Sequence, residues 1–219
     1  MSALVISLGC GVIGYLIGSI PFGYLIVKLV KGVDIRQYGS GRTGGTNVFR
    51  VAGFPAGLAT AMLDIGKGAV VVLIARSLFP QTQGWAEALA GVGVVLGHNA
   101  SCFLGFRGGA GGATATGTAL ALWTLGGLPG LVVGVFVLFV IGYASLATIL
   151  SGVSIALVFT IAALAGDTVP LAYGAFGWGV VILQALALRP NIARLLAGTE
   201  KRVTLGDKRA SLSDKQKAV

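Results

Sequence analysis

The sequence predicts an all-α integral membrane protein with about seven transmembrane helices, on the evidence of its hydropathy, its glycine content and its apolar segments. The chain has 219 residues, of which 55% are hydrophobic and only 11% are charged. Its mean hydropathy of +0.91 exceeds what a soluble domain of this size can bury. Glycine accounts for 36 residues, and small residues let membrane helices pack closely. We expect one polytopic membrane domain over residues 1–205 and a basic, flexible cytoplasmic tail over residues 206–219.

Seven apolar segments are expected to enter or cross the membrane, and some of them are short or broken. They are residues 3–27, 55–79, 86–106, a short piece ending near 125, 131–149, 152–166 and 171–188. Pro21 is expected to break the first segment, because proline in a membrane helix frees a backbone carbonyl. Turns are predicted at residues 126–130 and near Ser151 and Gly152.

The basic residues predict the orientation of these segments. Residues 28–54 contain five Lys or Arg residues, the loop 107–117 contains one and the chain from Arg189 contains eight, together 14 of 16. The positive-inside rule then places both loops and the C-terminus in the cytoplasm and the N-terminus outside. The net charge of +9 does not indicate nucleic acid binding, because the basic residues form no stripe with aromatic ones.

Two glycine-rich polar loops stand out in this apolar chain. The first, at residues 39–50, reads GSGRTGGTNVFR, and the second, at residues 107–117, reads RGGAGGATATG. Successive backbone N–H groups in such loops can bind an anion, and an arginine can hold phosphate through two parallel hydrogen bonds. A single such loop is equally well explained as a hydrophilic connection between membrane helices. Two of them favour phosphate binding.

Other familiar motifs fail on their context. Residues 39–44 match the glycine pattern of a dinucleotide site, but a membrane helix precedes them where that site requires a strand. The second loop lacks the Gly-Lys-Ser/Thr ending of a P-loop. His98 lacks the aspartate that follows the histidine in His-x4-Asp acyltransferases. With one histidine and no cysteine cluster, no metal is expected.

Three of the charged or titratable residues inside the apolar segments are candidates for a role in the site. Asp64 and Lys67 are spaced to form an ion pair on one helix face, because residues three apart are neighbours on a helix. The alternative is a polar face directed at the site. His98, near a helix end, is expected to be a hydrogen-bonded structural residue, with a role as a base as the alternative.

Taken together, the loops and the tail resemble the bacterial acyl-phosphate:glycerol-3-phosphate acyltransferase family (PlsY). The first matching motif is Gly39-Ser40-Gly41 with Gly44, Thr46, Asn47 and Arg50. The second is Phe106-Arg107-Gly108-Gly109 with Gly111, Ala113 and Thr114, preceded by Gly97 and His98. The third is Arg189-Pro190-Asn191 with Arg194, Gly198, Thr199 and Glu200. Asp64, Lys67 and Gly68 also fall where the family carries them.

The resemblance implies a seven-helix enzyme that transfers a fatty acyl group from acyl-phosphate to glycerol 3-phosphate without a cofactor or metal. It also implies a monomer in the bacterial plasma (inner) membrane, with its active site on the cytoplasmic side. The implied catalytic residues are Ser40, Arg50, Asn191 and Glu200. The implied substrate-binding and phosphate-binding residues are Gly39, Gly41, Arg42, Thr46, Asn47, Arg107, Gly108, Gly109, Gly111, Thr114, Arg189 and Arg194. Asp64, Lys67 and His98 are further candidates.

The chain departs from the family pattern at its polar centre. Ala110 stands where the second motif usually has lysine, and Leu188 stands where the third usually has histidine. Arg42 replaces an asparagine of the first motif, so one cation is gained, and Arg42 or Arg107 is expected to compensate for the missing lysine. The alternatives are a paralogue with a changed acceptor or lost activity, and a small membrane transporter with broken helices.

Overall fold

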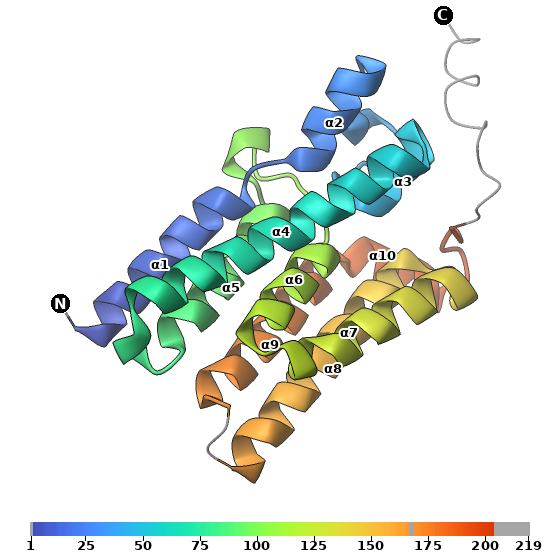
Figure 1. Cartoon of the computed structure of the whole chain (residues 1–219). Coiled ribbons are helices and arrows are strands. Elements are labelled where there is room, and N and C mark those ends of the chain that lie inside the picture. The colour runs from blue at the N-terminus through green and yellow to red at the C-terminus, as the bar shows by residue number, and fades with distance from the viewer. Residues whose placement is uncertain (1, 167–168, 204–219) are drawn as a thin grey trace, which may run out of the picture.

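The computed structural model describes residues 2–166 and 169–203, and this part of the chain is a bundle of α-helices without β-strands (Figure 1). The helices are α1 (Ala3–Gly18), α2 (Phe22–Lys31), α3 (Gly45–Ala52), α4 (Phe54–Leu78), α5 (Trp85–Asn99), α6 (Gly112–Leu122), α7 (Thr124–Phe136), α8 (Ala144–Ala165), α9 (Leu171–Ala187) and α10 (Arg189–Leu196). A π-helical turn, Val137–Ile141, extends α7. The expected tail over 206–219 lies outside the described residues.

The predicted all-α membrane fold is confirmed. Five described segments are long and apolar enough to cross a membrane: Ala3–Lys31, Phe54–Leu78, Trp85–Leu104, Thr124–Ile141 and Ala144–Ala165. A sixth is formed if α9 and α10, which meet at a bend of 71°, count as one span. The remaining predicted segment is α6, whose 11 residues extend only about 16 Å, roughly half of the hydrocarbon thickness.

The first span breaks where the sequence predicts. α1 ends at Gly18, and α2 begins directly after Pro21, which has no N–H to continue the helical hydrogen bonds. The hydroxyl of Ser101 donates to the carbonyl of Ser19 over 2.6 Å. A side chain from a later segment therefore satisfies backbone that the break exposes.

The predicted boundaries of the fifth and sixth segments are wrong. Residues 126–130 are not a turn but part of α7, which contains Pro129. The break lies instead at Gly142, whose φ of 88° is left-handed and ends the helix. Ser151 and Gly152 lie in the middle of α8. The third segment is also shorter as an α-helix than predicted, ending at Asn99.

The glycines of α7 serve close packing rather than a turn. A side chain at Gly127 would overlap the backbone of Leu120 in α6, and one at Gly130 would overlap Ile155 in α8. Because glycine has no side chain, the helix backbones can approach closely. This close contact stabilises the packing of membrane helices. The same rule explains α1 and α5, where a side chain at Gly14 would meet the α5 backbone.

The helices form two groups that meet around the short α6. α1, α4 and α5 lie side by side, α7, α8 and α9 lie together, and α6 packs between them against α4, α7 and α8 (Figure 1). The first glycine loop, the second glycine loop and α10 gather at one end of the bundle. Within the described residues, parts of all three matching motifs thus lie at one end of the protein, around one cavity.

Candidate active site

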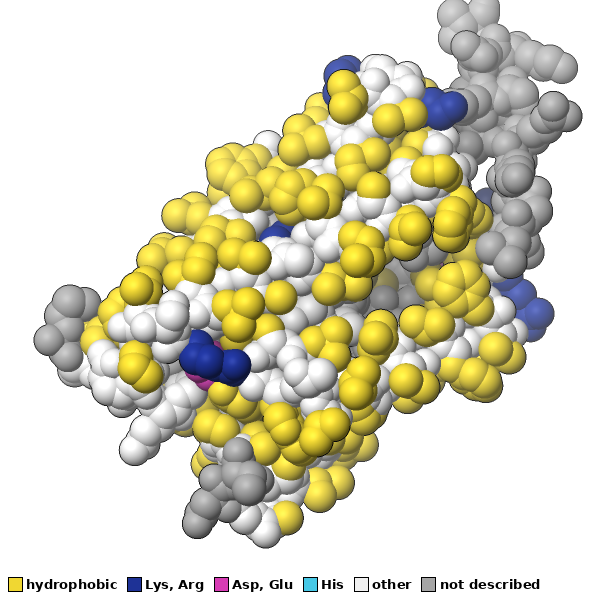
Figure 2. Space-filling view, viewed as in Figure 1, with side chains coloured by type: hydrophobic (Ala, Val, Ile, Leu, Met, Phe, Trp, Pro, Cys, Tyr) yellow, Lys and Arg dark blue, Asp and Glu magenta, His cyan; other side chains and the backbone are white. Residues whose placement is uncertain are grey.

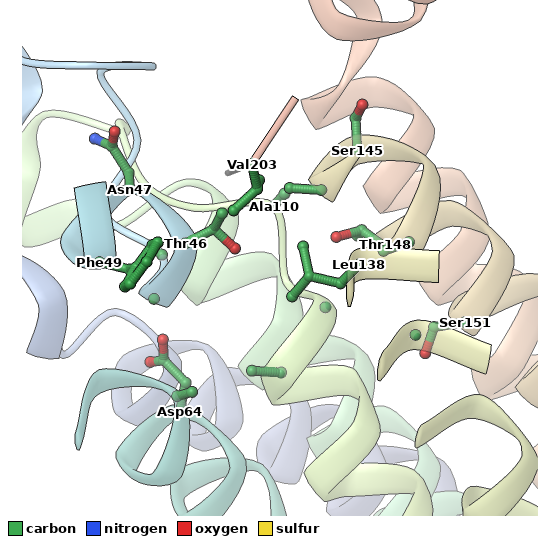
Figure 3. Close-up of a pocket in the computed structure, with 18 of the residues that line it drawn as sticks. Thr46, Asn47, Phe49, Asp64, Ala110, Leu138, Ser145, Thr148, Ser151 and Val203 are labelled. Carbon is green, nitrogen blue, oxygen red and sulfur yellow. The ribbon is translucent and has the colours of Figure 1, made fainter. Parts of the chain in front are cut away.

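A cavity of about 410 Å³ lies where the glycine loops meet the helix bundle (Figure 3). Its polar end is lined by side chains from the first and third motifs, namely Ser40, Arg42, Thr46, Asn47, Arg50, Asn191 and Glu200, and Gly111 of the second motif also lines the cavity. Its deeper wall is apolar and comes from α4 and α7, with Leu58, Ala61, Ile65, Leu131, Val135 and Leu138. The cavity therefore offers one end to a charged group and the other to a hydrocarbon chain.

The apolar wall reaches the outer surface of the bundle. Phe54 of α4 is 55% exposed and Phe139, just after α7, is 60% exposed, and both line the cavity. Figure 2 shows a hollow here, bordered by hydrophobic side chains. Since the surrounding surface is apolar enough to face lipid, the cavity opens sideways toward the bilayer.

Asn47 holds the first glycine loop in shape. Its buried amide nitrogen donates to the carbonyls of Tyr38 at 3.1 Å and Arg42 at 2.8 Å. Its side-chain oxygen accepts the backbone N–H of Ser40 at 3.0 Å. Gly39, with a left-handed φ of 58°, lies against that oxygen and leaves no room for a side chain. Asn47 thus orients the loop that presents Ser40.

The second glycine loop is built around His98. The N–H of Gly109 donates to the carbonyl of His98 over 2.9 Å, and a side chain at Gly109 would overlap the imidazole ring. A side chain at Gly108 would meet the same carbonyl. The N–H of Thr43 donates to the carbonyl of Gly108 at 3.4 Å, which joins the two glycine loops. The loop ends at Gly111, in left-handed geometry, where α6 begins.

Arg42 connects all three motifs. Its Nη1 donates to the carbonyl of Gly109 at 3.2 Å, and its Nη2 donates to Asn191 Oδ1 at 3.3 Å and to the carbonyl of Ala187. Burial, together with the positive charge of Arg194, lowers the pKa of Arg42. Arginine nonetheless stays protonated at neutral pH. A fixed cation therefore lies at the polar end of the cavity.

Glu200 completes the polar end from beyond α10. Its Oε1 accepts from Asn191 Nδ2 at 2.7 Å and from the hydroxyl of Ser145 at 3.2 Å, and its Oε2 accepts from Arg194 Nε at 2.8 Å. Burial raises the pKa of Glu200, but the hydrogen bonds from Asn191 and Arg194 outweigh it, so the pKa is lowered. An ionised carboxylate thus fixes the amide of Asn191 beside Arg42.

The expected site residues divide between those that line the cavity and those that do not. The lining ones are Ser40, Arg42, Thr46, Asn47, Arg50, Asp64, His98, Gly111, Asn191 and Glu200. The residues that do not line it are Gly39, Gly41, Lys67, Gly108, Gly109 and the buried Thr114. Arg107 and Arg189 are exposed outside it, and Arg194 reaches it only through Glu200. Of the two proposed substitute cations, Arg42 is the one in the cavity.

A row of hydroxyl groups on α8 was not expected from the sequence. Ser145, Thr148 and Ser151 line the cavity, and Thr116 of α6 joins them. Figure 3 shows Thr148 across the cavity from Thr46, with Ala110 between them. The sequence does indicate this row, because Ser145, Thr148 and Ser151 occur at every third position and therefore lie on one face of a mostly apolar helix.

The expected ion pair between Asp64 and Lys67 is confirmed. Lys67 Nζ lies 2.8 Å from Asp64 Oδ1, and His98 Nδ1 lies 3.4 Å from the same oxygen. Asp64 and His98 both line the cavity, and Lys67 lies behind them. His98 is thus a hydrogen-bonded member of a buried cluster. Within the described residues, no group of three or more His, Cys, Asp or Glu side chains is arranged to hold a metal ion.

Comparison with known proteins agrees with this architecture. Residues 8–198 match the family described as "Glycerol-3-phosphate acyltransferase". A protein of that name from Halalkalibacterium halodurans is 39% identical over 86% of this chain and 91% of its own length. One from a Thermoanaerobacter species is 40% identical over 88% and 93%, respectively.

Two crystal structures of PlsY (YgiH), described as an integral membrane glycerol 3-phosphate acyltransferase, have the same fold. The glycerol 3-phosphate form matches with a TM-score of 0.81 at 36% identity, covering 90% of this chain and 96% of that one. The lysophosphatidic acid form matches with a TM-score of 0.79, covering 90% and 94%. This chain therefore belongs to the glycerol-3-phosphate acyltransferase family.

Proposed function

We propose that the cavity transfers a fatty acyl group from acyl-phosphate to the sn-1 hydroxyl of glycerol 3-phosphate, a step of phospholipid synthesis. The observation that carries this proposal is the union, in one cavity, of a cationic polar end and an apolar wall open to lipid. A long-chain acyl donor needs the wall, and two phosphate-bearing substrates need the polar end. The family membership supports the acyltransferase reaction.

In the proposed step, the sn-1 hydroxyl oxygen attacks the carbonyl carbon of acyl-phosphate. The bond from that carbon to the bridging phosphate oxygen breaks, inorganic phosphate leaves, and the hydroxyl proton passes to a phosphate oxygen. The products are a lysophosphatidic acid and phosphate. Because acyl-phosphate is a mixed anhydride with a good leaving group, orientation and charge stabilisation can supply most of the catalysis.

We assign the residue roles on the motifs shared with the family, and the lining of the cavity supports these assignments. Ser40 and Arg50, on the first loop and α3, are assigned to a substrate phosphate. Arg42 supplies positive charge at the position next to Ala110, and Asn191, oriented by Glu200, lies beside it. Such charge-assisted contacts are stronger than those between neutral groups.

We further propose that the protein works as a monomer in the bacterial plasma membrane. Its N-terminus is then outside, and its C-terminus and active site are cytoplasmic, because most basic residues of the sequence fall in residues 28–54, in the second loop and after Leu188. A transporter would need its polar residues near the middle of the membrane. The polar residues of the cavity instead gather at one end of the bundle, which supports the enzyme over a transporter.

The test uses purified full-length protein with palmitoyl-phosphate and glycerol 3-phosphate, with lysophosphatidate and released phosphate followed together. We expect the two products in equal amounts. A parallel reaction with palmitoyl-CoA should give no lysophosphatidate. Turnover with palmitoyl-CoA alone would overturn the choice of donor, and no turnover with either donor would favour a paralogue with changed chemistry.

A further inference from the structure

A buried polar cluster lies at the wall of the cavity, between α4 and α5, with Asp64 and His98 in the lining and Lys67 behind them. Asp64, Lys67 and His98 are only 1%, 6% and 7% exposed. Lys67 Nζ lies 2.8 Å from Asp64 Oδ1 and 3.0 Å from His98 Nδ1. Burying charged groups in a membrane protein is costly even when they are paired. Packing alone would be served as well by apolar side chains, so the cluster calls for a further role.

The ammonium group of Lys67 is also bound at the break in the first span. It donates to the carbonyl of Ile20 at 3.2 Å and lies 5.5 Å from the ring centroid of Phe22. In transporters with broken helices, such carbonyls coordinate a bound cation. Here the side chain of Lys67 takes that position, which ties the break to α4 and, through His98, to α5.

His98 carries this connection into the active site. Its carbonyl accepts the N–H of Gly109 at 2.9 Å, and its ring lies against the α-carbon of Gly109. The carbonyl of Gly109 accepts from Arg42 Nη1 at 3.2 Å. An unbroken series of short contacts therefore runs from Asp64 and Lys67 through His98 and Gly109 to the guanidinium of Arg42.

We infer that Asp64, Lys67 and His98 are positioning residues, which set the place of the second glycine loop and thereby of the Arg42 guanidinium. The kinetic side of this inference rests on the proposed acyltransferase function. Displacing a catalytic group by about 1 Å can cost on the order of a hundredfold in rate. A buried network with discrete hydrogen bonds holds a loop more exactly in place than apolar packing, which tolerates small shifts.

The fold contains a matched control for this inference. Arg76 and Glu87 also pair α4 with α5, with Nε and Oε1 2.8 Å apart, and Tyr173 donates to Glu87. None of these three residues lines the cavity. The Arg76 side chain is 41% exposed and that of Lys67 only 3%, so removing the control pair tests what a more exposed ion pair of α4 contributes to stability alone.

The experiment compares His98→Gln and Lys67→Met with the control Arg76→Met in purified full-length protein. For each, the midpoint of thermal unfolding, kcat and KM for glycerol 3-phosphate are measured with palmitoyl-phosphate as donor. We expect the cluster variants to lose kcat by about ten- to a hundredfold, with Lys67→Arg recovering part of it. Arg76→Met should lower only the unfolding midpoint. Cluster variants that unfold earlier but keep kcat and KM would overturn the inference.

Two further measurements separate positioning from other roles. If Lys67→Met does not fold because it leaves the Asp64 charge unpaired, the double variant Asp64→Asn with Lys67→Met removes both charges and takes its place. The pH profile of His98→Gln should keep the shape of the wild-type profile, whereas loss of one limb would mean that His98 is a proton-transferring base and would overturn the assignment.

The coupling to Arg42 is tested by combining Lys67→Met with Arg42→Lys. If the cluster acts through Arg42, the double variant should be about as slow as the slower single variant, while losses that multiply would contradict the connection. Calorimetric binding of glycerol 3-phosphate to the same proteins gives a readout without turnover. If the wild-type protein does not transfer acyl groups, the proposed function fails. Weaker binding of glycerol 3-phosphate by the cluster variants, but not by Arg76→Met, would still support the positioning role.

Discussion

The guanidinium of Arg42 donates to the side-chain oxygen of Asn191 over 3.3 Å and so joins the first glycine loop to α10, across 149 positions of the chain. Its other partners are the carbonyls of Gly109 and Ala187. These residues directly precede Ala110 and Leu188, where the resemblance leads one to expect a lysine and a histidine. Arg42 therefore brings a cation beside both positions at which the site lacks an expected polar group.

Arg42→Asn alone should be nearly inactive if Arg42 is the substitute cation, because the polar end of the cavity then loses its fixed charge. Combining it with Ala110→Lys should restore activity, since an ammonium group beside bound phosphate is worth about 1.5–3 kcal/mol, or roughly ten- to a hundredfold. The assay is acyl transfer from palmitoyl-phosphate, with Ala110→Lys alone as the reference. Full activity in Arg42→Asn would refute the compensation.

Arg50→Lys should weaken glycerol 3-phosphate binding and slow the reaction. Lysine keeps the charge but loses the planar pair of donors that matches phosphate. The measurements are calorimetric binding and kcat/KM, and the matched control is Arg76→Lys, which makes the same exchange away from the cavity. Unchanged binding and turnover in Arg50→Lys would rule out the assignment of Arg50 to phosphate.

Cysteines placed at Arg36 and Arg107 should react with a membrane-impermeant maleimide only from the cytoplasmic side. The background has Cys10 and Cys102 replaced, and Gln81→Cys serves as the control because this exposed residue lies in the turn between α4 and α5. Gln81→Cys should react in intact cells, and the other two only after lysis. Reaction of Arg36→Cys or Arg107→Cys in intact cells would reverse the proposed topology.

Glu200 should stabilise the protein at neutral pH and lose that effect in acid. Its folded-state pKa is lowered from the usual 4.5, so the stabilisation is present above pH 4.5 and is lost as the pH falls through the folded pKa. The midpoint of thermal unfolding should therefore be higher for wild type than for Glu200→Gln at pH 7, and the gap should close in acid. A gap that is constant from pH 7 to the acid limit would contradict this linkage.

The sequence predicted the fold correctly at positions where the residue type allows only one structural outcome inside a membrane. Pro21 cannot continue a helix, and Asp64 and Lys67 must pair to be buried, so both predictions are confirmed. The glycines and the proline of residues 126–130 are compatible with either a turn or close contact between helices. In the folded protein they lie in α7, and the glycines allow close contact with α6 and α8. The break at Gly142 follows from one left-handed residue, which the apolar pattern around it conceals.

For the site, the sequence predicted which motifs meet but not which side chains turn inward. Arg42 and Arg107 are equivalent candidates by composition, yet the first is bound to the second glycine loop, α9 and α10, and the second is exposed. The difference comes from loop backbone geometry, which no periodic pattern reports. Thr148 escaped prediction because it belongs to no motif and lies within an apolar segment.

The sideways opening beside Phe54 and Phe139 determines which concentration of acyl donor governs the rate. An acyl donor that arrives through this opening is dissolved in two dimensions, so its activity is a mole fraction of the surrounding lipid and not a molarity in water. Adding inert phospholipid at a fixed amount of donor should then slow turnover, while enlarging the water volume at a fixed concentration of glycerol 3-phosphate should not. The acceptor is dissolved in water and follows ordinary bulk kinetics. The rate therefore depends on a surface concentration for the donor and on a bulk concentration for the acceptor.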